Sequence, residues 1–385
     1  MRALRKFLEV AVLSGIFISL SISEALSIMP VEVASGYKVE KVATGVVPVP
    51  TSIAFGPDGK LYVTSLSGFI MAVDTTSGVA SPVLFPGALT MPVGLAFHPY
   101  TGKMYVTDNY VVPGGNPLVP DDVKSRISII DMDDGGVSIN TFVDGIPSMF
   151  FEELPIPVTG SQGIDFDSDG NLYVAQGIND YSREVGDPLN SAILKIDEDG
   201  HVSVFASGLR SPYDVVVAKE DRYGRARALY AGDNGEGEEC EGCPDPYAPS
   251  RMYHDELNMV VAGAYYGWPD NSLGNTRDPL WEFGPLDPSD DESWPVPTGI
   301  ETWHGKWGSS DSLLFLAFFN CRSLFGRQDI GTIEMFTGND YTKRITLAWF
   351  VDAPIDVTMG PDKRLYFIEY LSGDIYRITP DKKKH

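Results

Sequence analysis

The chain has 385 residues, of which 43% are hydrophobic and 21% charged, so it is long and apolar enough to bury a large core. Its formal net charge of -24 predicts an acidic surface that repels nucleic acid and anionic membranes, which argues against nucleic-acid binding. The 39 glycines and 28 prolines are typical of many short strands joined by tight turns.

The first 25 residues are predicted to be a secretory signal peptide. Three basic residues precede an apolar run from Phe7 to Ile22, and Ser23-Glu24-Ala25 then offers small residues at the two positions that determine cleavage. The run is short for a membrane span and contains Glu9, although an uncleaved anchor is the alternative. Residues 26–36 then form a linker. We therefore expect a secreted, periplasmic or cell-surface protein that has no membrane contact after cleavage.

From residue 37 to residue 380 one pattern recurs in six copies. Each copy has an apolar strand, a polar turn and a second strand of the Leu-Tyr-Val-Thr kind, and most add a third strand. Such units, repeated every 40 to 60 residues or so, predict an all-β six-bladed propeller with four-stranded antiparallel blades. We expect Tyr37–Ala43 to complete the last blade and close the ring, which leaves 381–385 as a basic tail. The copies begin at Pro50, Pro92, Ser161, Ser211, Pro297 and Pro354.

The third copy contains DFDSDG, at residues 165–170, which looks like the start of a calcium-binding EF-hand loop. It aligns with the turns FGPDG and MGPDK of other copies, and Asp169-Gly170 favours a tight turn. An EF-hand would need flanking helices and a Glu at its twelfth place, which is Gln176 here, on a predicted strand. The sequence therefore predicts a hairpin turn that binds no metal.

The loops that begin each innermost strand, and those that follow each second strand, are expected to meet around the central channel. Carboxylates and amides at these positions suit a hard cation such as calcium, which takes six to eight oxygen ligands. The alternative is that they only hold turns. The first set is Ser52, Gly94, Gly163, Asp214, Gly299 and Asp356, and the second is Ser65, Asp108, Asn109, Asn179, Asp180, Asp233, Asn234 and Glu369.

Two segments of the fourth copy carry a family resemblance. GLRSPYDVVV at 208–217 and DELNMVVAGAYYGWP at 255–269 resemble motifs of the soluble sugar dehydrogenases that depend on pyrroloquinoline quinone (PQQ), the glucose/sorbosone dehydrogenase family. The closing GPDKRLYFIEYLSGDIYRI is also similar, so the resemblance covers about residues 38–379. It implies a six-bladed propeller that oxidises an aldose at its anomeric carbon, with PQQ as hydride acceptor beside calcium. It leaves the electron acceptor unknown.

The resemblance assigns four residues to PQQ. Arg210 matches the family arginine that contacts PQQ, and Ser211 follows it in the same motif. Trp294, in Ser-Trp-Pro, would stack on the flat quinone, and Arg322 would stand for a lysine of the fifth blade. Arg210 would also stabilise negative charge that develops on the quinone.

The same resemblance places calcium just after the second strand of the fourth copy. The backbone carbonyls of Gly235 and Glu236 would bind the ion, and Asp233 and Asn234 adjoin them. A cation there would act as a Lewis acid beside a quinone oxygen.

The chain departs from the family pattern at two places. The family's general base is a His entering the third blade, whereas 158–163 contains no His, and a Thr or Ser hydroxyl cannot replace it unaided. Basic residues entering the sixth blade are replaced by 352–356, DAPID, which weakens a site for the three carboxylates of PQQ. The remaining candidates for a catalytic base are His254 and His304, in predicted long loops, and Asp214.

Other His and Cys residues carry no chemistry in this interpretation. His98 and His201 fall in turns and are expected at the surface. Cys240 and Cys243 are expected to form a local disulfide, because a zinc ribbon needs a second pair, and Cys321 is expected to be a buried thiol.

Three functions remain open. The first is an exported sugar dehydrogenase that uses PQQ and calcium. The second is a calcium-dependent lactonase or esterase on the same scaffold, with a metal-bound water. The third is a non-catalytic propeller that binds a carbohydrate or a protein. The absent His favours the second and third, whereas the DELN…YGWP block and Trp294 favour the first.

Overall fold

The computed structural model describes most of the chain, and all of its named elements are β-strands. No helix in this part of the chain is long and apolar enough to cross a membrane. The described residues are 30–116, 119, 122–133, 136–148, 160–178, 187–218, 228–235, 254–269, 276–283, 295–308, 310–324, 327–338 and 341–381. The predicted signal peptide therefore lies outside them and stays a prediction.

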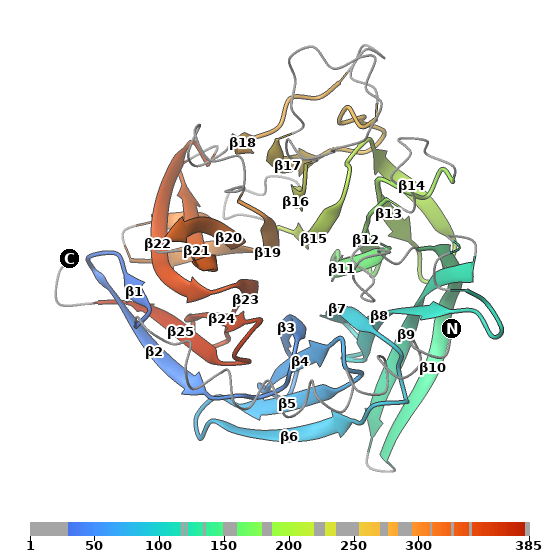
Figure 1. Ribbon diagram of the computed structural model, residues 1–385, viewed down its shortest axis with the longest axis horizontal. Coiled ribbons are helices and arrows are strands. Elements are labelled where there is room, and N and C mark those ends of the chain that lie inside the picture. Colours follow the sequence, from blue (N-terminus) through green and yellow to red (C-terminus); the bar gives the residue numbers. More distant parts are fainter. Residues whose placement is uncertain are drawn as a thin grey trace.

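The strands form six antiparallel sheets around one axis, as predicted from the six copies (Figure 1). The first three blades each run from the innermost strand outward in chain order. Blade 1 holds β3 (Pro50–Phe55), β4 (Leu61–Ser65), β5 (Ile70–Asp74) and β6 (Val79–Leu84). Blade 2 holds β7 (Pro92–Phe97), β8 (Met104–Val111), β9 (Val123–Asp133) and β10 (Gly136–Pro147). Blade 3 holds β11 (Ser161–Phe166), β12 (Leu172–Gln176), β13 (Ala192–Ile196) and β14 (Val202–Ser207).

The second half of the ring follows the same order and is closed by the N-terminal strands. Blade 4 holds β15 (Pro212–Val217), β16 (Leu229–Asp233), β17 (Asp255–Val260) and β18 (Trp281–Phe283). Blade 5 holds β19 (Pro297–Trp307), β20 (Ser310–Leu324), β21 (Arg327–Thr337), β22 (Lys343–Asp352) and β1 (Glu32–Val33). Blade 6 holds β23 (Pro354–Met359), β24 (Leu365–Glu369), β25 (Ile375–Pro380) and β2 (Tyr37–Ala43).

The ring closes where the sequence predicted. Strand β2 pairs antiparallel with β25, with Val39 opposite Ile378, so residues from both ends of the chain share blade 6. Strand β1 was not predicted: it adds a fifth strand to blade 5 by pairing with β22, and Trp349 Nε1 donates to Glu32 Oε2 at 2.9 Å. Because an outer strand otherwise leaves its backbone groups unpaired, β1 covers part of that edge.

The core lies between the blades. Every residue of the second strands β4, β12, β16 and β24 is buried, as expected for strands covered on both faces. Neighbouring blades share apolar clusters: Ile70 of blade 1 packs with Leu95 and Met104 of blade 2 in one of them. The repeated Leu-Tyr-Val strands therefore hold the blades together.

DFDSDG is a hairpin turn between β11 and β12, as predicted. Asp167 Oδ1 accepts hydrogen bonds from the backbone N–H groups of Asp169 and Asn171, both at 2.9 Å. Asp165, which would begin an EF-hand loop, lies on β11 and accepts from Val217 N–H in the next blade at 2.8 Å. The first two acidic side chains of the would-be loop thus have separate structural roles.

Candidate functional site

The candidate site lies at the face of the ring where the innermost strands begin and the second strands end, which we call the mouth. The innermost strands β3, β7, β11, β15, β19 and β23 contact one another around the centre of the ring (Figure 1). Each is paired on its outer side only, so backbone N–H groups on its inner side need other acceptors.

Carboxylates supply those acceptors near the axis. Asp356 on β23 accepts from Ile53 N–H at 2.7 Å and from the Ser52 hydroxyl at 2.8 Å, both on β3. Asp214 on β15 accepts from Ile300 N–H on β19 at 3.0 Å. These side chains therefore link neighbouring innermost strands that share no backbone ladder.

The same arrangement recurs two residues further along the innermost strands. Asp165 links β11 to Val217 of β15, and Glu301 links β19 to Met359 of β23, each at 2.8 Å. All four carboxylates also accept from the N–H of the residue that follows them in the chain. We call Asp165, Asp214, Glu301 and Asp356 the axial carboxylates.

Two glycines leave room for the axial carboxylates. A Cβ atom on Gly163 would lie 1.9 Å from Asp214 Oδ1, and one on Gly299 would lie 2.2 Å from Asp356 Oδ1. These glycines were predicted to lie at the mouth, but local sequence pattern offered no reason for their identity. Their role is to accept a carboxylate from the next blade.

Two of the axial carboxylates, Asp214 and Asp356, hold protons more tightly than free acids. Burial, and then the negative charge of Asp356, raises the pKa of Asp214 well above its ordinary value. Burial raises the pKa of Asp356 to about 7, against the opposing effect of its hydrogen-bond donors. At neutral pH the carboxyl groups of Asp214 and Asp356 therefore remain partly protonated inside the ring.

Acidic side chains at the ends of the second strands hold the loops at the mouth. Asp108 accepts from the backbone N–H groups of Thr90 and Met91, at 2.8 and 2.6 Å. Glu369 accepts from Asp352 N–H at 3.0 Å. Such bonds match the alternative that these residues only hold turns.

Arg210 lies at the mouth of blade 4, beside the loop where the family resemblance places calcium. Its Nη1 donates to the carbonyl oxygens of Gly235 and Asn234, at 2.8 and 3.3 Å. The guanidinium lies over the Trp268 ring, 5.6 Å from its centroid. Its Nε is buried and has no hydrogen-bond partner in the described part of the chain. Asp233 accepts from the backbone N–H groups of Arg210 and Ser211, at 2.9 and 2.7 Å.

The two motifs that carried the resemblance form one unit in the structure. Trp268 N–H donates to Gly208 O at 2.8 Å, and Tyr266 N–H donates to Ser207 O at 2.9 Å. The Tyr265 hydroxyl donates to Trp268 O at 2.6 Å. The YGWP turn therefore fixes the loop that presents Arg210, which explains a motif that secondary-structure reasoning left unexplained.

Strand β17 adds two acidic residues of the DELN motif, Asp255 and Glu256, to which the sequence analysis gave no role in the site. Burial, and then repulsion by Asp233, raises the pKa of Glu256 to about 8. Burial raises the pKa of Asp233 to about 7 and that of Asp255 well above its ordinary value. Three buried acceptor atoms of this blade have no hydrogen-bond partner in the described residues: Asn234 Oδ1, Asp255 Oδ2 and Asn258 Oδ1.

Tyr213 bridges opposite sides of the mouth. Its hydroxyl donates to Thr51 O at 3.1 Å, which joins β15 of blade 4 to β3 of blade 1 across the ring (Figure 1). Tyr213 packs in one apolar cluster with Phe319 and Tyr370, whose rings meet edge to face at 5.3 Å.

The two candidate histidines do not lie over the channel. His254 precedes β17, and its Nδ1 lies 3.1 Å from Glu282 on the outermost strand β18. His304 was expected in a long loop, but it lies within β19, seven residues past the start of that strand at the mouth. That placement is a correction, because β19 extends far beyond the short strand suggested by its first residues.

His98 also differs from expectation. It was expected at the surface, yet it is only 9% exposed, because its ring packs edge to face on Phe166 of blade 3 at 5.0 Å.

His201 is exposed, as expected. With Asp197 and Asp199 it forms the one group of His, Cys and acidic residues with metal-like spacing that the described residues contain. That group lies in a hairpin turn of blade 3, away from the mouth.

Several predicted residues lie outside the described part of the chain. The backbone of Arg322 is described on β20, opposite Ile330, four residues beyond the pairing of Phe318 with Pro297 at the mouth. Its side chain and that of Cys321 are not described. Six of the predicted residues are outside the described part altogether: Trp294, Glu236, Asn179, Asp180, Cys240 and Cys243.

Comparison with known proteins supports the architecture. No family model matches the chain, and no curated protein matches it. Among solved structures, a Thermus thermophilus protein provisionally assigned as a glucose dehydrogenase-type oxidoreductase is 21% identical, with a TM-score of 0.65 over 89% of this chain and 100% of that one. The chain has the fold of the soluble sugar dehydrogenases.

Two further structures agree with this fold. The soluble aldose sugar dehydrogenase of Escherichia coli, in its apo form, is 16% identical with a TM-score of 0.63, over 89% of this chain and 99% of that one. The PQQ domain of pyranose dehydrogenase from Coprinopsis cinerea, in its holo form, is 16% identical with a TM-score of 0.58, over 91% and 97%. At these identities the likeness establishes the fold.

Proposed function

We propose that the chain is an exported sugar dehydrogenase that oxidises an aldose at its anomeric carbon, with calcium and PQQ bound at the mouth of blade 4. One observation carries the proposal: two backbone carbonyls, those of Asn234 and Gly235, converge on the positive charge of Arg210. The fold likeness to sugar dehydrogenases supports the choice of substrate class.

The residues of blade 4 fit a calcium ion. Calcium prefers oxygen ligands, including backbone carbonyls and amide oxygens. The Gly235 carbonyl already faces a cation, and the unpartnered oxygens of Asn234 and Asp255 supply further acceptors in the same blade. A buried acceptor without a partner carries a desolvation cost that an ion would remove. A bound cation would also favour the ionised form of the Asp255 carboxyl.

The residues fit one oxyanion of PQQ. Arg210 has a buried Nε–H without a partner, which suits an acceptor oxygen. Arg126, another cation at the mouth, is bound to Asp108 through Nε and Nη2, at 2.9 and 2.6 Å. The parts of PQQ beyond this oxyanion would need contacts from Arg322 and Trp294, as the family resemblance implies. When bound, PQQ accepts the hydride, and calcium polarises its quinone oxygen.

In place of the missing His, we assign the proton acceptor to Glu256. Glu256 is a half-buried residue, the second of β17, and burial raises the pKa of its carboxyl to about 8. Its Oε2 accepts from Asn258 at 3.0 Å, which orients the side chain. Glu256 would take the proton of the anomeric hydroxyl while the hydride leaves the anomeric carbon, so the aldose becomes a lactone. Asp214 is less suited, because both its oxygens accept backbone N–H groups.

The test is a turnover assay. The purified chain, supplied with PQQ and calcium, should reduce an electron-accepting dye when an aldose is added, and release the lactone. The matched control is the methyl glycoside of the same sugar, which has no anomeric hydroxyl and therefore no hydroxyl proton for the base to take. Glu256→Gln should abolish turnover while PQQ retention is unchanged. If none of the aldoses tested leads to dye reduction, the proposal is overturned.

A second function, calcium-dependent lactone hydrolysis, is favoured by one observation. Residues 158–163 lack the His of the dehydrogenases, while buried carboxylates with raised pKa values crowd the mouth. Such a group could activate a calcium-bound water. Lactone hydrolysis that needs calcium but not PQQ, and that a chelator abolishes, would select this function.

A further inference from the structure

A pocket of about 370 Å³ opens on the face of the ring opposite the mouth, between blades 1 and 6. Three hairpin turns and two strands form it: the β3–β4, β5–β6 and β23–β24 turns, the end of β3, and β25. This volume is within the range of small-molecule sites. Its lining residues are Phe55, Gly59, Thr75, Thr76, Pro361, Asp362, Arg364 and Arg377. None of them belongs to the mouth.

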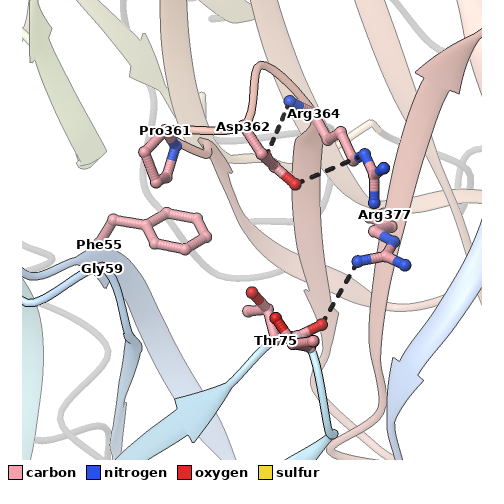
Figure 2. Close-up of a pocket in the computed structure, with 8 residues that line it drawn as sticks. Phe55, Gly59, Thr75, Pro361, Asp362, Arg364 and Arg377 are labelled. Atoms are coloured by element: carbon pink, nitrogen blue, oxygen red, sulfur yellow. Dashed lines mark hydrogen bonds and ion pairs between the residues drawn. The ribbon is translucent and has the colours of Figure 1, made fainter.

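Two arginines share one side of this pocket. Figure 2 shows the guanidinium groups of Arg364 and Arg377 next to each other, with the Phe55 ring and Pro361 across the pocket from them. Each guanidinium is also paired with one carboxylate, Arg377 with Glu40 and Arg364 with Asp362, so the cavity offers guanidinium donors rather than a net positive charge. Two like charges this close repel, and an oxyanion between them would turn repulsion into attraction.

The two guanidinium groups are held to different degrees. Arg377 is fixed: Nε donates to Glu40 Oε2 at 2.9 Å, and Nη1 donates to Thr75 O at 3.3 Å. Arg364 is loosely held, with Nε 3.5 Å from Asp362 Oδ2 and the side chain 37% exposed. Its Nη1 and Nη2 have no protein partner among the described residues, so they can turn to a ligand. Arg guanidinium groups bind carboxylate and phosphate through paired hydrogen bonds.

The opposite wall is apolar and rigid. The Phe55 ring packs edge to face on Tyr366, 5.1 Å between centroids, which fixes the face that it turns to the pocket. Tyr366 is fully buried and is itself held by Asp362 Oδ2, to which its hydroxyl donates at 3.0 Å. Pro361 extends this wall. A flat ring would find aromatic and proline contacts there.

We infer that this pocket binds a small molecule that joins an oxyanion, phosphate or carboxylate, to a ring. The oxyanion would lie at Arg364 and Arg377, and the ring against Phe55 and Pro361. Asp362 opposes the oxyanion, so it limits the affinity and keeps the Arg364 side chain near the pocket in the absence of a ligand. The site is independent of the function proposed for the mouth.

Calorimetric titration with phenyl phosphate, benzoate and inorganic phosphate tests the inference. We expect saturable binding of one phenyl phosphate per chain with Kd of about 1 mM or tighter, and weaker binding of inorganic phosphate, which lacks the ring. Benzoate that binds as well as phenyl phosphate would assign the site to carboxylates, and benzoate that does not bind would assign it to phosphates. No saturable binding of either ring compound would overturn the inference.

Two variants with opposite expected effects make the test specific. Arg364→Gln should weaken phenyl phosphate about tenfold, because it removes one charge–charge hydrogen bond without touching the core. Asp362→Asn should tighten it several-fold, because it removes the opposing charge and keeps the acceptor for Arg364 N–H. The matched control is Lys103→Gln, an exposed cation in the β7–β8 turn that pairs with Asp131 at 2.6 Å. Equal affinity in Arg364→Gln and the parent chain, or an equal loss in Lys103→Gln, would overturn the inference.

Discussion

Arg210 donates a 2.8 Å hydrogen bond to the carbonyl oxygen of Gly235, an oxygen that the family resemblance assigns to calcium. The guanidinium and a calcium ion would therefore compete for one acceptor. Asn234, whose carbonyl accepts from the same Nη1 at 3.3 Å, belongs to the same contact. The competition makes the role of this loop measurable.

Arg210→Gln should tighten calcium binding about tenfold, because the competing positive charge is removed while the Gly235 carbonyl remains. The same substitution should weaken PQQ retention, because the unpartnered Nε–H is lost. Calorimetric titration with calcium alone, and then with PQQ, measures the two effects separately. Lys103→Gln is the control for a general change in net charge. Weaker calcium binding in Arg210→Gln would contradict the competition.

The free energy of unfolding should fall as the pH rises from 5 to 8. In the folded chain the pKa values of Asp233, Asp356 and Glu369 are about 7 and that of Glu256 is about 8. Their unfolded values are near 4, so the folded chain binds more protons between about pH 4 and pH 8. Because unfolding releases these protons, stability decreases with pH in this window, by about 1.4 kcal/mol per pH unit for each group that is protonated in the folded chain and ionised in the unfolded chain. Below about pH 4, groups such as Asp167, whose pKa is lowered, act in the opposite direction.

Urea unfolding midpoints at pH 5, 6, 7 and 8 check this expectation. Glu369→Gln should flatten the profile, because it replaces one of the titrating groups and keeps an acceptor for Asp352 N–H. A midpoint that rises steadily between pH 5 and pH 8 would mean that these carboxyl groups are ionised in the folded chain.

Gly163→Ala should destabilise the ring, because the new Cβ would lie 1.9 Å from Asp214 Oδ1. A misfit of this kind costs about 1–3 kcal/mol. In an Asp214→Ala background the same substitution should cost less but still destabilise the ring, since the carboxylate is gone while the backbone Cα of residue 214 stays 2.7 Å from the new Cβ. The double-mutant cycle, measured by urea unfolding, gives the coupling directly. If the two substitutions change the free energy of unfolding additively, the Asp214 side chain is not the reason that residue 163 is a glycine.

Asp356→Ala should be more damaging than Asp356→Asn. Alanine leaves three donors without an acceptor, the N–H groups of Ile53 and Val357 and the hydroxyl of Ser52, at a cost of about 3 kcal/mol. Asparagine keeps one acceptor oxygen and removes a charge that burial disfavours. The two thermal midpoints give the comparison. Equal losses would mean that the charge, rather than the hydrogen bonds, links β23 to β3.

The parts of the fold that sequence could predict depend on local pattern. The alternating strands, the DFDSDG turn and the closing strand Tyr37–Ala43 were all confirmed, because turn chemistry and period-two burial are local. The pairing of Glu32–Val33 with β22 and the burial of His98 depend on contacts with distant residues, which the local pattern does not contain. His304 was misplaced because the length of β19 depends on its pairing with β20.

The same distinction applies to the site. The sequence predicted that Asp214 and Asp356 lie near the axis. It did not predict the axial role of Asp165 and Glu301, because their hydrogen-bond partners lie in other blades. Family resemblance found Arg210, whereas the crowding of carboxylates around Asp233 required the structure, because their pKa values are raised by burial. The Asp-Glu pair that begins β17 was the available signal.

The most direct test of the proposed function is gel filtration of the purified chain with excess PQQ, in the presence and absence of calcium. We predict that about one quinone per chain elutes with the protein at micromolar concentrations when calcium is present, and that its absorbance bleaches when an aldose is added. A chelator should release the quinone. Quinone that elutes apart from the protein under all these conditions would contradict the account.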